Sequence, residues 1–252
     1  DDTSAVRLDR CLPAGSFQLV TKDILVESVH FRLKDFSLSQ LARKALAVNL
    51  SDIAAMGGEP LYFYLGLAFP VSLPSDAAFE FFEGLRQGCE AWNVQLAGGD
   101  FSSSPVMMIS ITVTGHSPTP VYRHTAQTGD RVAITGPTGE SAAGLKLLLN
   151  ETESFSEPET YFIQKHKTPV PELDKGRILA RYASAMIDVS DGVLLDFNRI
   201  LTASKRGGTI VYENVPISPA LKKLCIDNNW NEPETVLSGG EDYVLLFTIS
   251  PD

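Results

Sequence analysis

The chain has few cysteines and no long apolar run. Its three cysteines, Cys11, Cys89 and Cys225, are far apart and do not follow the spacing of a zinc site. We therefore expect neither a disulfide framework nor a zinc centre, and reducing, cytoplasmic surroundings are the default. The longest apolar stretch, LYFYLGLAFPVSL at residues 61–73, is shorter than the roughly 20 residues that span a bilayer. We expect no membrane segment.

Positive charge is also scarce. The sequence contains 21 Lys and Arg against 31 Asp and Glu, which gives a formal net charge of −10, and it has no run of basic residues. This balance argues against nucleic acid or an anionic membrane as the main partner. A substrate that carries several phosphates would need divalent cations, and the excess carboxylates could hold them.

The common catalytic motifs are missing as well. The sequence has no Walker A motif, no G-x-G-x-x-G and no G-x-S-x-G, and its four histidines have no evident triad partners. The closest approach to a phosphate loop is TGPTGESAAG, residues 135–144, which joins a predicted strand to a predicted helix. Its amides could hold an anion at the helix N-terminus, or the segment could be a plain tight turn. We expect no catalytic nucleophile from the protein.

The order of apolar and polar segments predicts two domains. Up to residue 130 the pattern reads strand, helix, strand, helix, strand, strand, and it restarts with a strand at 131–136. The alternation in VMMISITVTG, residues 106–115, is typical of a half-buried strand in an antiparallel or mixed sheet. We therefore predict domains at 1–130 and 131–252. Because the chain stops just after a strand, we expect the natural protein to continue past Asp252.

Five local assignments follow from the same pattern. Residues 17–31 are predicted as two extended pieces with a bend at Asp23, residues 41–56 as a helix, 150–160 as an exposed loop and 208–215 as a strand. A second helix is predicted to begin after Ser75 as its N-cap and to bury one face, formed by Ala78, Phe82, Leu85, Cys89 and Trp92.

The helix at 41–56 contains an aspartate, Asp52, although nearly all its faces are apolar. A helix that is apolar all round is expected to be buried, and a buried carboxylate needs a partner. Other aspartates also follow an apolar segment next to small residues: Asp1, Asp2, Asp23, Asp100, Asp188 and Asp191. Each alone could be a turn residue or an N-cap, and Asp191 best fits a plain cap. Together they favour a shared carboxylate cluster for Mg²⁺ or Ca²⁺, and Mg²⁺ with bridging phosphates is the better match.

Three further candidates remain ambiguous from the residues alone. His30 lies just after Asp23 and could serve a site or a polar strand edge. Arg123 could neutralise a phosphate, although a position in a surface loop is favoured. Glu241 and Asp242 precede an apolar strand, where turn formation and function are equally compatible.

Five stretches in this order resemble one family. They are TKDILVESVHF, KALAVNLSDIAAMGGEP, LAGGD, IDVSDG and LSGGEDYVLLFT, spread over nearly the whole chain. The sequence resembles thiamine-monophosphate kinase, in the superfamily that includes aminoimidazole ribonucleotide synthetase. The resemblance implies ATP-dependent phosphorylation of thiamine monophosphate to thiamine diphosphate by direct phosphoryl transfer. It also implies an α+β fold in two domains, with mixed or antiparallel sheets, helices on one face, and the first domains of two subunits paired into a barrel-like homodimer.

The resemblance also assigns residues to roles. Several Mg²⁺ ions would be held by Asp1 or Asp2, Asp23, Asp52, Asp100, Asp188 and Asp191, with help from Thr21. ATP would contact Gly99, Asp100, Arg123 and Ser190. Thiamine monophosphate would contact His30 and Glu241. Phosphoryl transfer depends on alignment and charge neutralisation more than on a protein nucleophile, so such a set can suffice without a Walker lysine.

Three positions depart from the family pattern. Lys22 stands where Thr or Ser is usual, Ser28 where Gly is usual, and Phe101 where Thr is common. These departures keep two alternatives open. One is a related ATP-using enzyme, resembling aminoimidazole ribonucleotide synthetase or selenophosphate synthetase, and the other is a non-catalytic nucleotide-binding regulator.

Overall fold

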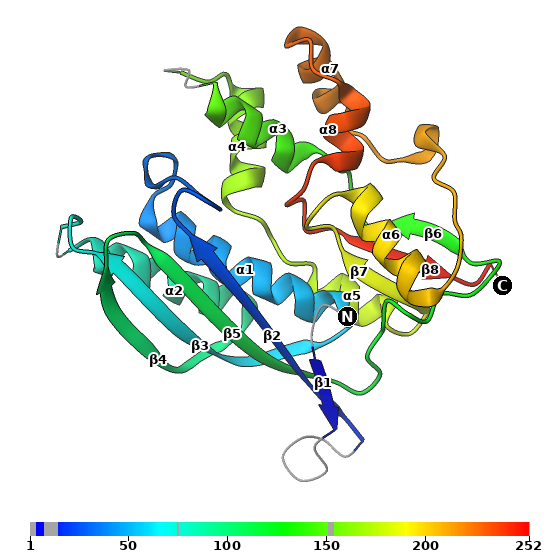
Figure 1. Cartoon of the computed structure of the whole chain (residues 1–252), viewed down its shortest axis with the longest axis horizontal. Coiled ribbons are helices and arrows are strands. Elements are labelled where there is room, and N and C mark those ends of the chain that lie inside the picture. The colour runs from blue at the N-terminus through cyan, green and yellow to red at the C-terminus, as the bar shows by residue number, and fades with distance from the viewer. Residues whose placement is uncertain (1–3, 8–14, 75, 151–153, 252) are drawn as a thin grey trace.

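The computed structural model describes residues 4–7, 15–74, 76–150 and 154–251, which form an α+β fold with two sheets (Figure 1). The first sheet has the strand order β1-β2-β5-β3-β4. Its strands are β1 (Ser4–Arg7), β2 (Phe17–Val26), β3 (Glu59–Pro70), β4 (Gln95–Ser104) and β5 (Met108–Ser117). The sheet is mixed, because β3 and β4 are parallel while all its other neighbours are antiparallel.

The second sheet is antiparallel, with the order β6-β8-β7. Its strands are β6 (Arg131–Ile134), β7 (Ala183–Asp188) and β8 (Leu245–Ile249). The strand predicted at 208–215 is wrong, since this segment is irregular and ends in a short 3₁₀ helix, η2 (Tyr212–Asn214). Its apolar Ile210 packs against the core around Phe197, but no strand in the described chain pairs with its backbone. Burial of alternate side chains without a pairing partner does not make a strand.

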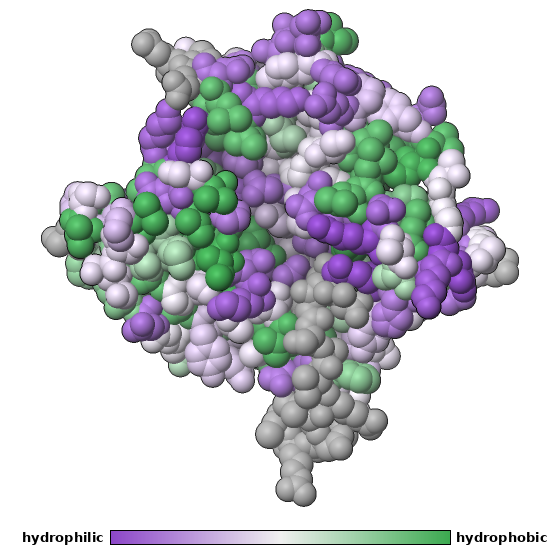
Figure 2. Space-filling model, viewed as in Figure 1, coloured by the Kyte–Doolittle hydropathy of each residue, from purple (hydrophilic) through white to green (hydrophobic). Residues whose placement is uncertain are grey.

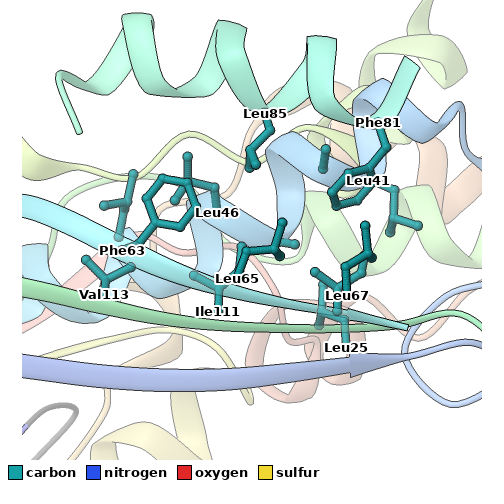
Figure 3. Packing of buried hydrophobic residues seen from close by; sticks show 14 of the residues in the cluster. Leu25, Leu41, Leu46, Phe63, Leu65, Leu67, Phe81, Leu85, Ile111 and Val113 are labelled. Carbon is teal, nitrogen blue, oxygen red and sulfur yellow. The ribbon is translucent and has the colours of Figure 1, made fainter. Parts of the chain in front are cut away.

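Two helices, α1 (Leu38–Ala55) and α2 (Ala77–Trp92), cover one face of the first sheet. Figure 3 shows the resulting core, in which Leu41, Leu46 and Leu85 from the helices meet Phe63 and Ile111 from the sheet. Helix α1 begins with a capping box, because Ser37 accepts a hydrogen bond from the Gln40 N–H while the Gln40 side chain accepts one from the Ser37 N–H.

Helix α1 is apolar all round because it packs between the two sheets. Leu41 and Ile53 belong to the core of the first sheet, whereas Ala54 and Ala55 pack against Met186 and Phe247 of the second. The prediction of a buried helix here is confirmed, and its second partner is the sheet that comes later in the sequence.

The predicted face of α2 is confirmed at Leu85, which is buried, and at Ala78, Cys89 and Trp92, which pack against the core, but it is wrong at Phe82. Phe81, Gly84, Leu85 and Gly88 are buried, while Phe82 is 39% exposed. A Cβ atom on Gly84 would lie 2.3 Å from the carbonyl oxygen of Ser39, so α1 and α2 approach closest at this glycine. A search for apolar side chains passes over a glycine contact, which explains why Gly84 and Gly88 were not predicted on this face. The predicted N-cap Ser75 lies outside the described residues, and the N-cap position is Asp76.

The remaining helices lie in the upper part of Figure 1 or beside the second sheet. They are η1 (Leu33–Asp35), α3 (Glu140–Leu149), α4 (Glu157–Lys167), α5 (Leu173–Leu179), α6 (Val193–Ser204), α7 (Pro219–Asp227) and α8 (Glu232–Ser238). The exposed loop predicted at 150–160 contains the start of α4. There the Ser156 N–H donates a hydrogen bond of 2.8 Å to the Glu159 carboxylate. Acidic residues stabilise the first turn of a helix, so their density here marked a helix start. None of the described helices combines the length and apolarity needed to cross a membrane.

Candidate active site

Strand β2 carries the first two site residues on the face that turns toward α1. It runs straight from Phe17 to Val26, so the predicted bend at Asp23 is wrong. Successive side chains of a strand point to opposite faces, so Thr21 and Asp23 share one face and Lys22 takes the other. On that opposite face the Lys22 ammonium donates a hydrogen bond of 2.8 Å to the Ser110 hydroxyl of β5. The unusual lysine therefore points away from Asp23.

Helix α1 connects β2 to the site. The Asn49 side chain accepts a hydrogen bond from the Asp23 N–H, at 3.0 Å, and donates to its own helix at Ala45 O. One turn further on, Asp52 accepts a hydrogen bond from the Thr21 hydroxyl. Asp52 is partly exposed, which differs from the fully buried position expected. Its carboxylate therefore lies at the edge of the core, where it can meet a ligand.

The same helix reaches the second sheet through Ser51. Its hydroxyl donates a hydrogen bond of 2.6 Å to Oδ2 of Asp188, at the end of β7. Asp188 is only 2% exposed, as the strand pattern predicted for a buried carboxylate. Asp23, Asp52 and Asp188 thus come from β2, α1 and β7. Hydrogen bonds of Asn49, Asp52 and Ser51 on α1 join these three elements.

Tyr243, which the sequence analysis missed, lies among these carboxylates. Burial raises the pKa of its hydroxyl well above the ordinary value, and four negative charges raise it further, those of Glu241, Asp188, Asp23 and Asp52. Both Glu241 and Tyr243 have left-handed backbones, with φ of +64° and +53°. The Glu241 N–H donates to Ser190 O at 2.8 Å, and the Tyr243 N–H donates to Val189 O at 2.9 Å. In the sequence, only the two adjacent glycines before Glu241 indicated a tight loop at this position.

His30 lies in an exposed turn directly after β2. Its Nδ1 accepts a hydrogen bond from the Val26 N–H at 3.0 Å, so the ring helps to close the turn and its proton belongs on Nε2. Burial raises the pKa of Asp23, and the nearby His30 lowers it by a smaller amount. His30 is therefore near Asp23, as the sequence suggested, and it also has a structural role.

Asp191 is not a helix cap. Its carboxylate forms an ion pair with Arg199 at 2.6 Å, and its N–H donates to Asp196 Oδ2 at 3.0 Å. The N-cap position of α6 is Gly192. Arg123 lies in the loop between β5 and β6, where its carbonyl oxygen accepts a hydrogen bond from the Ser204 hydroxyl at 2.9 Å.

Gly99 and Asp100 lie apart from the other candidates. They are exposed on β4, at the edge of the sheet, whereas Asp23 lies three strands away on β2. Three strand spacings amount to about 14 Å. Phe101 packs near Phe82 of α2, so its neighbour Asp100 points to the opposite, open face. The chain does not bring Asp100 together with Asp23. Asp1 and Asp2 lie outside the described residues.

The loop at 135–144 offers no open anion site at the start of α3. The Asp242 carboxylate accepts hydrogen bonds from the Gly139 N–H at 2.6 Å and the Ser141 N–H at 3.0 Å. The chain thus supplies its own carboxyl group to these amides, and a tight turn is the better interpretation.

The carboxylates near Tyr243 do not form a ready-made metal cage. Among the described residues, no group of three or more His, Cys, Asp or Glu side chains is placed to hold a metal ion. Figure 2 shows a recess near the middle of one face of the molecule, with hydrophilic residues along its wall. The geometry is that of separate oxygen donors on three elements.

Comparison with known proteins identifies the family. Residues 1–117 match the model of the AIR synthase related protein, N-terminal domain. Thiamine-monophosphate kinase of Aquifex aeolicus (strain VF5) is 37% identical over 230 residues, which cover 91% of this chain and 75% of that protein. The enzyme of Bacillus subtilis (strain 168) is 38% identical, over 94% of this chain and 73% of its own. The chain belongs to the thiamine-monophosphate kinase family.

Structural comparison agrees with this family. The structure of AaThiL complexed with AMPPCP and TMP superposes on 99% of this chain and 79% of its own, with a TM-score of 0.94 and 36% identity. Hydrogenase maturation protein HypE in complex with ATP has a TM-score of 0.74 at 16% identity, so it shares the fold alone. In this thiamine-monophosphate kinase family member, the departures at Lys22 and Phe101 lie on β2 and β4, outside the group around Tyr243.

Proposed function

We propose that the protein transfers the γ-phosphoryl group of ATP to thiamine monophosphate and forms thiamine diphosphate and ADP. The observation that carries this proposal is that Asp23, Asp52 and Asp188, on elements joined through hydrogen bonds of α1, lie around Tyr243 in a chain with this family membership. The complex of AaThiL with AMPPCP and TMP supports both substrates, since AMPPCP is an ATP analogue.

The donor set fits Mg²⁺. All its members are oxygen donors, which Mg²⁺ prefers, and Mg²⁺ is usually held by one or two carboxylates together with substrate phosphates. Carboxylates that stand apart until a nucleotide arrives suit that mode better than a closed cage would. We assign the metal ligands to Asp23, Asp52, Asp100, Asp188 and Asp191, with Thr21 and with Asp1 or Asp2. When bound, Mg²⁺ would neutralise charge on the phosphates during transfer.

The remaining assignments divide the site between two ligands. Gly99, Asp100, Arg123 and Ser190 are proposed to contact ATP, and His30 and Glu241 to contact thiamine monophosphate. Ser190 and Glu241 are joined by a backbone hydrogen bond, so the two ligands would meet at this point. Such contacts align the acceptor phosphate with the γ-phosphate, which is the main requirement of phosphoryl transfer.

A homodimer is part of the proposal. The face of the first sheet opposite α1 and α2, on which none of the described helices lies, carries exposed apolar side chains, among them Ile24, Tyr64 and Met108. Asp100 points to the same face and lies about 14 Å, three strand spacings, from Asp23. We propose that two open faces pair into a barrel-like dimer in which the β4 edge of one copy meets the opposite edge of the other sheet, and that at this edge Asp100 and Gly99 of one copy complete the site of the other. The division into domains 1–130 and 131–252 is supported by the separate sheets, and a cytoplasmic location rests on the low cysteine content.

The test is an assay of purified full-length protein with ATP and Mg²⁺, with and without thiamine monophosphate. We expect ADP release that requires all three components, with thiamine diphosphate identified by mass spectrometry. Chelation of Mg²⁺ with EDTA should abolish product formation, and added Mg²⁺ should restore it. A folded protein that binds ATP but makes no thiamine diphosphate would contradict the proposal and favour a related enzyme or a regulator.

A further inference from the structure

A buried charged cluster surrounds the Glu241 carboxylate, and apart from Glu241 its members have no role in the function proposed so far. Its members are Lys44 on α1, Ser141 on α3, His166 on α4 and Glu241 before β8. Lys44 is only 1% exposed, and His166 is 4% exposed. Burial of an ammonium group is unfavourable unless hydrogen-bond acceptors and an opposite charge surround it. The contacts of the Lys44 ammonium therefore indicate its structural role.

The Lys44 ammonium is bound on several sides. It donates to Glu241 Oε2 at 2.9 Å and to the carbonyl oxygen of His166 at 2.8 Å, and it lies 5.5 Å from the centre of the Phe36 ring. Burial lowers the pKa of Lys44, and the Glu241 charge opposes this effect. Because almost none of the side chain is accessible, Lys44 cannot contact a ligand itself. It can act only through Glu241.

The His166 ring is the second donor to the same carboxylate. Its Nδ1 lies 3.1 Å from Glu241 Oε2 and 3.1 Å from the Ser141 hydroxyl oxygen. A carboxylate only accepts hydrogen bonds, so Nδ1 carries the proton and donates. Burial lowers the pKa of His166, which favours a neutral ring. Two donors thus hold one oxygen of Glu241.

Glu241 is fixed but not fully enclosed. Its backbone is held by Ser190, its side chain is 29% exposed, and both donors bind Oε2. Burial opposes ionisation, but His166 and Lys44 outweigh it and hold the pKa of this carboxyl below its ordinary range. The second oxygen, Oε1, is thereby left to accept from a ligand, on a group whose position and negative charge are both set by the protein.

We propose that Lys44 and His166 are positioning residues that hold the Glu241 carboxylate for the cationic thiazolium and amino-bearing pyrimidine of thiamine monophosphate. This inference rests on the proposed function, in which Glu241 contacts that substrate. Lys44 and His166 come from α1 and α4, so they also fix where the two halves of the chain meet at the substrate.

The test is equilibrium binding of thiamine monophosphate to the full-length protein by calorimetry, in parallel with the KM for each substrate. We expect Lys44→Met to weaken thiamine monophosphate binding by about tenfold or more, with less than about a twofold change in the KM for ATP. His166→Phe should act in the same direction. His166→Asn should restore most of the affinity, because its amide can donate from nearly the same place as Nδ1.

The decisive comparison is the double variant Lys44→Met with Glu241→Gln. If Lys44 acts through Glu241, the double variant binds as weakly as Glu241→Gln alone, whereas independent effects would multiply. Lys146→Met is the matched control, since Lys146 also combines a hydrogen bond, to Thr235, with an aromatic contact, to Trp230, but is not bonded to Glu241. It should bind thiamine monophosphate normally.

Circular dichroism and thermal unfolding establish first that each variant is folded. If Lys44→Met fails to fold, the His166→Phe and His166→Asn pair carries the test. Multiplying effects, an equal loss for ATP, or no loss in any of these variants would overturn the inference. Binding that depends on Lys44 and His166 in a protein that makes no thiamine diphosphate would uphold the inference while the proposed reaction fails.

Discussion

At the scale of the residue, Asp52 stands at the edge of the core, where the Thr21 hydroxyl binds one of its oxygens. Asp52→Asn should lower turnover by at least about 100-fold, because an amide has no charge with which to hold a metal ion. The fold should persist, since the amide oxygen can still accept from Thr21. The measurement is kcat together with thermal unfolding.

Asp174→Asn is the control for that variant. Asp174 is 85% exposed and pairs with Arg177 on the surface, so it should keep normal activity. Normal turnover in Asp52→Asn would remove Asp52 from the metal site.

Ser28 shows how a departure from the family pattern becomes a prediction about stability. Its φ is +67°, a left-handed conformation that is unfavourable for any residue with a Cβ atom and suits the glycine that the resemblance implies here. Ser28→Gly should raise the free energy of unfolding by about 0.5–1 kcal/mol, after allowance for the greater freedom of glycine in the unfolded chain. Urea denaturation measures the change.

Ser102→Gly provides the opposite case. Ser102 is exposed in the strand β4, and its backbone is not left-handed, so glycine there should lower stability. An unchanged or lower stability of Ser28→Gly would mean that the turn gains more from the serine side chain than the backbone loses.

The carboxylates of the candidate site could be predicted from the sequence, whereas the residues that surround them could not. Asp23, Asp52 and Asp188 could be predicted because a charged residue in an apolar segment is conspicuous. The same argument applied to Lys44, eight residues before Asp52 in the same helix, but long amphipathic side chains are easily read as solvent-facing. Tyr243 was hidden inside an apolar strand pattern. Its position near Asp23, Asp52 and Asp188 depends on three elements that are distant in the sequence, which no local pattern contains.

At the scale of the element, Asp242 links the loop before β8 to the start of α3. Burial raises the pKa of its carboxyl to about 7, against the opposing effect of the Ser141 and Gly139 N–H groups. The folded-state pKa thus lies above the ordinary value of 3.8, so the native protein binds a proton that the unfolded chain releases. The stabilisation is full below about pH 4 and is lost as the pH rises to about 7.

Asp242→Asn should therefore remove part of the pH dependence of stability. The free energy of unfolding of the unsubstituted protein, minus that of the variant, should be larger at pH 5 than at pH 8 by about 2 kcal/mol. Urea denaturation at both pH values measures this difference. An equal difference at the two pH values would show that Asp242 is ionised throughout and acts as a permanent anion at the helix start.

Element boundaries failed where a partner outside the segment decides the structure. The predicted face of α2 lacked Gly84, which contacts α1, and residues 208–215 form no strand because their backbone finds no neighbour in the described sheet. In contrast, the buried strand β5 followed its period-two pattern, with Ile109, Ile111 and Val113 inside. Local periodicity predicts an element well when a single sheet or helix layer covers it.

At the scale of the whole molecule, α1 explains why the site and the fold are inseparable. Over about two turns it reaches Glu241 through Lys44, β2 through Asn49 and Asp52, and β7 through Ser51. A helix that packs between two sheets has no solvent-facing side, so its polar residues must find protein or ligand partners. Lys44, Asn49, Ser51 and Asp52 of α1 therefore mark the place where the two halves of the chain meet at the candidate site.

The proposed dimer makes a prediction that a single chain cannot fulfil. If Asp100 of one copy completes the site that contains Asp52 of the other, mixing the two inactive variants should restore activity. In a dimer of one Asp52→Asn chain and one Asp100→Asn chain, one site would carry both substitutions and the other neither. Random pairing of equal amounts would make half of the dimers mixed, so activity should return to about a quarter of the unsubstituted value.

The measurement is product formation after the two variants are unfolded and refolded together, compared with each variant refolded alone. Tyr64→Lys, which places a charge on the open face, should give a monomer by light scattering and should prevent the recovery when it is added to both chains. If both aspartates acted within one chain, each site of a mixed dimer would carry one substitution, and no activity would return. Recovery in the mixture therefore separates a site shared between two copies from a site within one chain.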